Sequence, residues 1–192
     1  HHPTLRRQRQ MCIRDRDFSS VMPMLEEIEQ RSLREDLQNQ ILINASLLFK
    51  TGFAELSRAQ RLLARAVHRA DRDGDRRSAA GLRINLGNLL QSMDRRSEAR
   101  SVFRESLQIA EELGASGILM QVRYNLATLE LTAGRLPAAR QYIDQFERDA
   151  QGHTSREVQL RGMYLRAQLK LFFNEPAESL SLFEEIVASP AC

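Results

Sequence analysis

The sequence predicts an all-helical protein, an α-solenoid in which antiparallel helix pairs stack on one another. Three observations lead to this prediction. Apolar residues recur at spacings of three and four, small residues return every 40 positions, and no segment of useful length alternates apolar and polar residues as a strand would. A helix pair that repeats in this way covers its apolar face only by packing on the next pair, so the repeats must stack.

The 40-residue register rests on three columns of equivalent positions. They are the small residues Ala59, Ala99, Ala139 and Ser179, the bulky residues Leu63, Phe103, Ile143 and Phe183, and the small residues Gly87, Ala127 and Ala167. Glycine inside a helix costs about 0.5–1 kcal/mol relative to alanine, so Gly87 needs a packing reason. We expect Gly87 to nest against the region of Ala99 in the paired helix, and Phe103 to fill the gap between that pair and the next.

The individual helices follow from this periodicity and from the turn residues between them. We predict helices, in order, over residues 22–32, 34–51, 55–70, 76–93, 96–113, 116–133, 136–149, 155–173 and 176–188. Pro23 suits the first turn of the first helix. Glycine, asparagine and proline mark most of the intervening turns, at Gly52, Gly74, Gly114, Gly134 and Asn174-Glu175-Pro176.

The first 17 residues form a segment that we exclude from the fold. Residues 6–16 resemble, in one codon frame, the transposase adapter used in sequencing libraries, and residues 1–5 lie upstream of it. We therefore interpret 1–17 as a non-native, disordered segment of a metagenomic fragment; the alternative is a native basic arm. Without the five Arg and one Asp of residues 6–16, the formal net charge of +3 becomes −1. The electrostatic argument for a nucleic-acid partner disappears with it.

Cysteine content and hydropathy bear on the compartment. Cys12 lies in the adapter-like segment, which leaves Cys192 without an internal disulfide partner. No run of about 18 apolar residues and no signal segment is present. We expect a cytoplasmic protein with no membrane association.

Motifs for catalysis or cofactor binding are absent from the sequence. A P-loop needs a lysine directly after a glycine, and the two lysines, Lys50 and Lys170, follow Phe49 and Leu169. The acidic run 71–75 lacks the glycine and glutamate that a calcium loop requires at its sixth and twelfth positions. No Cys or His pair has metal-ligand spacing. The sequence predicts no enzyme, no cofactor and no metal site.

The repeat columns resemble the tetratricopeptide repeat. Leu86-Gly87, Ala99, Phe103 and Ser106 follow the consensus spacing of that family, although its usual unit is about 34 residues and this one is longer. The resemblance implies a right-handed superhelix. We divide it into repeats 38–75, 76–115, 116–154 and 155–192, preceded by a partial repeat helix in 18–37. The long unit is similar to helical sensor regions of bacterial signalling proteins.

The resemblance also implies that the first helix of each pair lines a concave groove. The groove positions that the resemblance implies are Asn88, Gln91, Gln121, Tyr124, Thr128, Arg161, Tyr164 and Gln168, and the same spacing adds Ile84, Leu131 and Leu171. Amides, hydroxyls and phenols in a row suit an extended peptide, whose backbone needs hydrogen-bond partners along its length. The alternative is that these side chains only face water or a neighbouring helix.

Three hypotheses for function follow. The favoured one is a protein–protein interaction scaffold within a larger bacterial signalling or transcription-regulatory protein, which binds a peptide or another domain of the same polypeptide. The alternatives are the sensor arm of a serine/threonine kinase or signalling ATPase, and a helical repeat that binds RNA. Because the last predicted helix is rich in apolar residues, we expect further repeats beyond residue 192.

Overall fold

The computed structural model describes residues 53–151 and 155–189, which lie in one compact unit, residues 46–192. The helices predicted over 22–32 and 34–51, and the adapter-like segment, fall outside the described residues. Within them the chain forms α4 (Phe53–Arg72), α5 (Arg76–Ser92), α6 (Arg96–Leu113), α7 (Ser116–Thr132), α8 (Leu136–Ala150), α9 (Arg156–Phe172) and α10 (Pro176–Ala188), with no strand. The all-α fold class is confirmed, and each of these helices lies within two residues of its predicted bounds.

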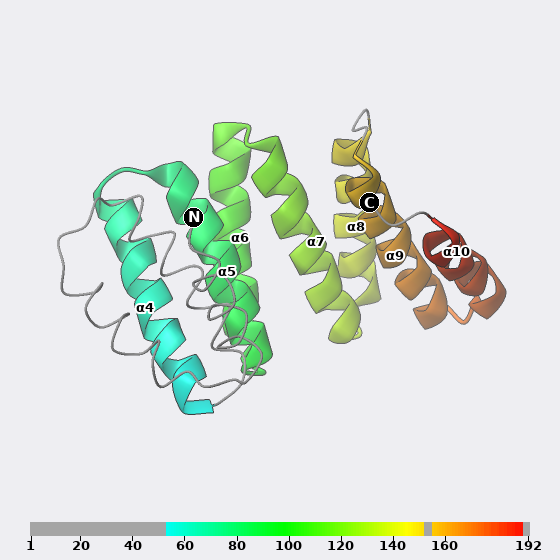
Figure 1. Ribbon diagram of the computed structural model, residues 1–192, viewed down its shortest axis with the longest axis horizontal. Coiled ribbons are helices and arrows are strands. Elements are labelled where there is room, and N and C mark those ends of the chain that lie inside the picture. The colour runs from blue at the N-terminus through cyan, green and yellow to red at the C-terminus, as the bar shows by residue number, and fades with distance from the viewer. Residues whose placement is uncertain (1–52, 152–154, 190–192) are drawn as a thin grey trace, which may run out of the picture. The chain divides into compact units, whose positions relative to one another are not determined.

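The helices follow one another as antiparallel pairs (Figure 1). Packing is most extensive within the pairs α5–α6 and α7–α8, and each helix also contacts the next one along the chain. The first helices of successive pairs, α5, α7 and α9, contact one another in sequence as well. This arrangement places the first helices of the three pairs side by side in one layer.

The turns repeat with the same 40-residue period as the helices. Gly74 and Gly114, after α4 and α6, both have positive φ angles of 74° and 59°. Asp94, Gly134 and Asn174, after α5, α7 and α9, have φ angles of 59°, 69° and 59°. Glycine, asparagine and aspartate adopt this left-handed conformation most readily. Gly74, Gly114, Gly134 and Asn174 are turn residues that the sequence predicts, whereas Asp94 is not one of them, and the predicted turn residue Gly52 lies outside the described residues.

The first column of small residues lies in the interior of the stack. Ala59, Ala99, Ala139 and Ser179 all have no exposed surface. Ser179 donates its hydroxyl hydrogen to the carbonyl oxygen of Ala167 on the paired helix, at 2.8 Å. A serine can therefore occupy this buried column because its polar group is satisfied across the pair.

Phe103 lies inside its own pair, which corrects the prediction that it fills the gap to the next one. A Cβ atom on Gly87 would come within 2.4 Å of Cε1 of the Phe103 ring. The ring, fully buried on α6, occupies the space that the missing side chain leaves on α5. Gly87 is required by an aromatic ring rather than by a close approach to Ala99.

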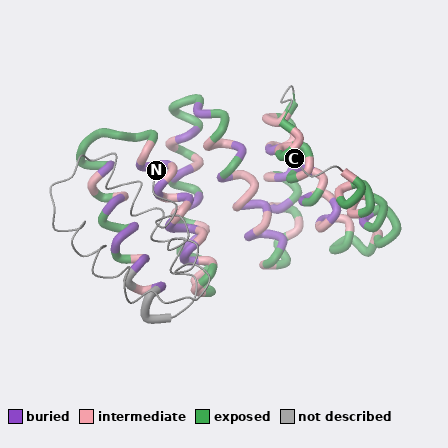
Figure 2. The backbone as a smooth tube through the Cα atoms, in the orientation of Figure 1, coloured by how far each residue is buried: buried purple, intermediate pink, exposed green. Residues whose placement is uncertain are grey.

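Burial decreases toward the last helix (Figure 2). Phe103 and Ile143 have no exposed surface, whereas Phe183, at the equivalent position of α10, is only partly buried. The helix α10 has one fully buried residue, Ser179, among those the structure describes. The apolar residues of α10 are therefore only partly covered by α9.

Two equivalent arginines connect neighbouring pairs. Arg83 on α5 contacts Asp71 on α4 at 2.8 Å and Glu105 on α6 at 3.1 Å. Forty residues later, Arg123 on α7 contacts Glu111 on α6 at 3.1 Å and also Asp149 on α8. Both arginine side chains are 12% exposed. Each arginine therefore bridges the second helices of two successive pairs.

Candidate functional site

The residues predicted to line the groove lie on α5, α7 and α9, the layer of first helices. Gln121, Arg161 and Tyr164 are exposed, and the others are partly buried: Asn88, Gln91, Tyr124, Thr128 and Gln168. None of these eight side chains is fully buried. Partners could therefore reach them from solvent.

Two of the additional apolar positions are wrong as groove residues. Ile84 and Leu131 are each 1% exposed. Leu131 belongs to a hydrophobic cluster that also contains Ile143 and Phe146 of α8. The helical spacing that selected the exposed polar residues also selected these two apolar side chains. They lie in the core, where no ligand can contact them. Leu171, at the position equivalent to Leu131, is 52% exposed and stays a candidate.

The most elaborate part of this surface is a cluster of Tyr124, Arg161, Tyr164 and Gln168, which we name the tyrosine cluster. The Arg161 guanidinium carbon lies 5.5 Å from the centre of the Tyr124 ring, within cation–π range. Gln168 donates from Nε2 to the Tyr164 hydroxyl oxygen at 2.9 Å. Two helices, α7 and α9, therefore present one continuous patch of aromatic rings with polar edges.

Each tyrosine of the cluster is held from below by a phenylalanine of a second helix. The rings of Tyr124 and Phe146 are 6.2 Å apart, and those of Tyr164 and Phe183 are 6.0 Å apart with near-perpendicular planes. The first pair is tilted, with 57° between its planes, and the second is close to the edge-to-face arrangement that aromatic rings favour. Burial, followed by the proximity of Tyr164, raises the pKa of the Tyr124 phenol above its ordinary value. The phenol of Tyr124 therefore stays a neutral donor.

Thr128 contributes less than its position suggests. Its hydroxyl donates to the carbonyl oxygen of Tyr124 one turn earlier, at 3.0 Å. The hydroxyl hydrogen is therefore used within α7, and only the oxygen lone pairs are open to a partner. Asn88 and Gln91 lie on α5, one helix pair before the tyrosine cluster.

One functional candidate was missed by sequence reasoning. The side-chain nitrogen of Asn125 on α7 is buried and has no acceptor among the residues that the structure describes. A buried amide hydrogen without an acceptor is rare in folded proteins. Asn85, 40 residues earlier, is the signal in the sequence that could have revealed this position, because an amide recurs there in the repeat register. Asn125 adds a donor beside Tyr124.

The central helix pairs match a family model. Residues 77–148, which span nearly all of α5, all of α6 and α7, and most of α8, match the model described as tetratricopeptide repeat. These residues are therefore similar to tetratricopeptide repeats. The last pair, α9–α10, lies outside the matched residues, in keeping with the substitution of Arg166 for the leucine of Leu86 and Leu126 in the repeat pattern.

A protein of known structure extends the comparison beyond residues 77–148. BtubC (BKLC) from P. vanneervenii aligns with a TM-score of 0.71 and 14% sequence identity, covering 94% of this chain and 74% of that one. At this identity the likeness shows a shared fold. No curated protein matches the sequence.

The described residues contain neither a membrane-spanning helix nor a cluster of metal-binding side chains. Over residues 53–151 and 155–189, no helix has the length and apolar character needed to cross a membrane. In the same part of the chain, no three or more His, Cys, Asp or Glu side chains are grouped so that they could hold a metal ion.

Proposed function

We propose that this chain is a protein–protein interaction scaffold that binds a peptide, or an extended segment of another domain, along α5, α7 and α9. Tetratricopeptide repeats generally act by binding protein or peptide partners. The single observation that supports this surface is the tyrosine cluster. Its rings are fixed by phenylalanines beneath them and its polar edges face solvent.

An extended peptide suits this surface because its backbone presents amide groups at regular intervals. Gln121 and Gln168 carry both donors and acceptors, and neither side chain is fully buried. Tyrosine and arginine are the side chains that most often dominate binding energy at protein interfaces. We therefore assign the main affinity to Tyr124, Tyr164 and Arg161, and orientation to the amides.

The charge distribution supports a protein partner over a nucleic acid. Several arginines are engaged by carboxylates of the same chain, among them Arg83, Arg123 and Arg166. Arg161 of the tyrosine cluster contacts Glu157 at 2.6 Å. Because nucleic-acid binding depends on cations that neutralise phosphates, paired arginines favour a partner whose affinity changes little with salt.

We further propose that the scaffold belongs to a larger cytoplasmic bacterial signalling or transcription-regulatory protein and acts by binding, with no catalysis of its own. The long 40-residue unit supports this context. A sensor arm of a serine/threonine kinase or signalling ATPase is the alternative. Sequencing the gene outward distinguishes them: a DNA-binding domain supports regulation, and a catalytic domain supports the sensor arm.

The binding surface can be tested with peptides selected from a random display library on the immobilised full chain. For a selected peptide, Tyr124→Ala and Tyr164→Ala should each lower the affinity by about tenfold or more, as expected for central aromatic residues. Tyr142→Ala on α8 is the matched control, because this tyrosine lies outside the layer of first helices. Isothermal titration calorimetry measures each affinity.

Two results would contradict the proposal. One is a selected peptide whose affinity falls with Tyr142→Ala and not with either cluster variant. The other is tight binding of a single-stranded RNA that weakens steeply between low and physiological salt, which would favour the RNA-binding alternative.

A further inference from the structure

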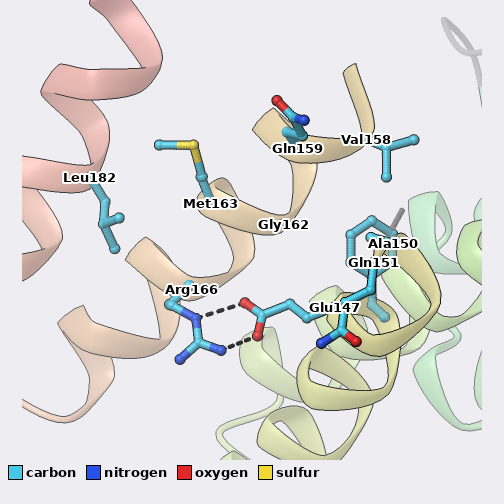
Figure 3. Close-up of a pocket in the computed structure, with 10 residues that line it drawn as sticks. Glu147, Ala150, Gln151, Val158, Gln159, Gly162, Met163, Arg166 and Leu182 are labelled. Atoms are coloured by element: carbon cyan, nitrogen blue, oxygen red, sulfur yellow. Dashed lines mark hydrogen bonds and ion pairs between the residues drawn. The ribbon is translucent and has the colours of Figure 1, made fainter. Parts of the chain in front are cut away.

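A second candidate site lies on the opposite side of α9 from the tyrosine cluster. A pocket of about 340 Å³ lies between α8, α9 and α10 (Figure 3). Its walls include Phe146 and Ala150 of α8, Met163 of α9 and Leu182 of α10. With 3.6 residues per helical turn, Gly162, Met163 and Arg166 fall on the face roughly opposite Arg161, Tyr164 and Gln168. The pocket is therefore separate from the proposed peptide surface.

The pocket exists because the last repeat lacks side chains that fill the same place in the two repeats before it. Gly162 stands where those repeats have Leu82 and Val122, which are 1% and 0% exposed. A Cβ atom on Gly162 would meet only Cε1 of Phe146 at 3.5 Å and Cδ1 at 3.9 Å, both ordinary contacts. The space next to Gly162 is thus a vacancy left by an aliphatic side chain.

The arginine–carboxylate ion pairs of the earlier repeats are also missing at the equivalent positions of the last repeat. Met163 replaces Arg83 and Arg123, the arginines that join two second helices. Gln151 replaces their carboxylate partners Asp71 and Glu111, which lie 80 and 40 residues earlier. The arginine and its acid have been lost together, which leaves this side of the pocket uncharged.

The ion pair at the pocket, between Arg166 and Glu147, has its charges neutralised within the pair. Arg166 donates from Nε to Glu147 at 2.7 Å, and its second nitrogen also contacts this carboxylate, as Figure 3 shows. In the preceding repeat these two positions hold Leu107 and Leu126. A bidentate pair leaves little net charge to attract an ionic ligand. The chemistry of the pocket therefore favours an uncharged, apolar occupant.

We propose that this pocket binds an aliphatic side chain, such as leucine, projecting from a partner protein. The side chain would occupy the position that Leu82 and Val122 fill in the earlier repeats. The volume is near the lower end of the roughly 300–1,000 Å³ typical of ligand pockets, which suits one side chain with part of its backbone. The amides of Gln151 and Gln159 at the pocket supply partners for that backbone.

The test uses small capped amino acids and the methyl NMR signal of Met163 in the full chain. N-acetyl-leucine methylamide should shift this signal saturably. The alanine and aspartate analogues should bind at least about tenfold more weakly, because a few methylenes in an apolar pocket change affinity by roughly 10–200-fold. Met93, the residue that follows α5, provides a reference signal that should not move. No saturable shift with the leucine compound, or equal binding of the aspartate compound, would overturn the proposal.

Variants of the pocket make the test specific. Gly162→Val, which supplies the side chain of Val122, should abolish the shift while circular dichroism shows a folded helical protein. Gly162→Ala adds only the tolerated Cβ atom, so it should fold in any case and weaken the leucine compound. Arg161→Ala, which changes the peptide surface on the opposite face of α9, should bind the compound as the unchanged protein does, and this separates the pocket from the peptide surface. Undiminished binding to both Gly162 variants would overturn the assignment of the site.

Discussion

The pairs α5–α6 and α9–α10 have the same architecture, but the last pair keeps only some of the residue types found at equivalent positions. In both, the small columns are kept: Ala99 and Ser179 are equally buried, and Gly87 and Ala167 occupy the same position. A neighbouring apolar position is not kept, since Leu86 on α5 has become Arg166 on α9. Small residues therefore fix the contact within a pair, and the large residues between pairs are open to exchange.

Exchange between pairs is possible because charge can replace apolar contact when both partners change. Arg166 and Glu147 lie at positions that hold Leu126 and Leu107 one repeat earlier. Within a pair no such exchange is available, because a ring such as Phe103 needs empty space on the facing helix. The difference predicts where the chain tolerates mutation and where it does not.

The largest expected effect comes from a buried charge in the centre of the stack. Glu130 is 1% exposed and contacts Arg100 and Arg135, each at 2.6 Å. Glu130→Ala should lower the free energy of unfolding by about 3 kcal/mol, since it strands the partly buried Arg100. Lys170→Ala, at the equivalent position of the last pair, should produce no resolvable change because its ion pairs are exposed to solvent. Urea denaturation of both variants decides, and equal losses would contradict the comparison.

The second effect contrasts two glycines in first helices. Gly87→Ala should destabilise the protein by about 1–2 kcal/mol, because overpacking against the fully buried Phe103 ring outweighs the better helix propensity of alanine. Gly162→Ala should instead stabilise it by about 0.5–1 kcal/mol, because its Cβ atom meets an ordinary contact. Thermal melts of the two variants show whether each substitution raises or lowers the melting temperature. A stabilising Gly87→Ala would show that the ring can move aside.

A smaller effect is expected at the turns. Gly134 has a φ angle of 69° and open space around its missing Cβ atom, so Gly134→Ala should cost about 1 kcal/mol through backbone strain alone. Asn174→Gly, at the equivalent turn of the last pair, should give a small gain in melting temperature because it relieves the same strain. A melting temperature unchanged by both substitutions would mean that the left-handed turns carry no strain.

The smallest effect is a dependence on acid pH. The hydrogen bond from Arg83 lowers the pKa of the Asp71 carboxyl. A carboxyl with a lowered folded-state pKa stabilises the protein above its unfolded value of about 3.9 and loses that contribution as the pH falls through the folded value. Asp71→Asn should therefore be less stable than the unchanged protein near neutral pH and should lose less stability below pH of about 4. The check is to measure the free energy of unfolding of both proteins as a function of pH. The same loss of stability at acid pH in the two proteins would contradict the prediction.

The helices and their stacking could be predicted from the sequence because each signal is local and repeated. Ala59 with its three equivalents, a recurring Gly74 and a shared helical spacing all indicate the same register. The role of Phe103 could not be predicted, because the sequence shows that Gly87 needs space without showing which side chain takes it. Ile84 and Leu131 were misplaced for a related reason: spacing gives a helix face, and only the neighbouring helices decide whether that face is covered.

The candidate site divides in the same way. Tyr124 and Tyr164 could be chosen from their equivalent places, but their phenylalanine supports come from other helices and are visible only in three dimensions. The pocket beside Gly162 was missed because a missing side chain gives no positive signal in the sequence. Comparing Gly162 with Leu82 and Val122 in the repeat register would have indicated it.

The central claim, that one ring and one glycine set the contact within a pair, is tested most directly by a double-mutant cycle of Gly87→Ala and Phe103→Leu. We predict that the smaller leucine makes room for the new Cβ atom. The double variant should therefore lose at least about 1 kcal/mol less unfolding free energy than the two single variants lose in sum. Stability changes that add to within about 0.5 kcal/mol would show that Gly87 and Phe103 are independent, and would contradict this account.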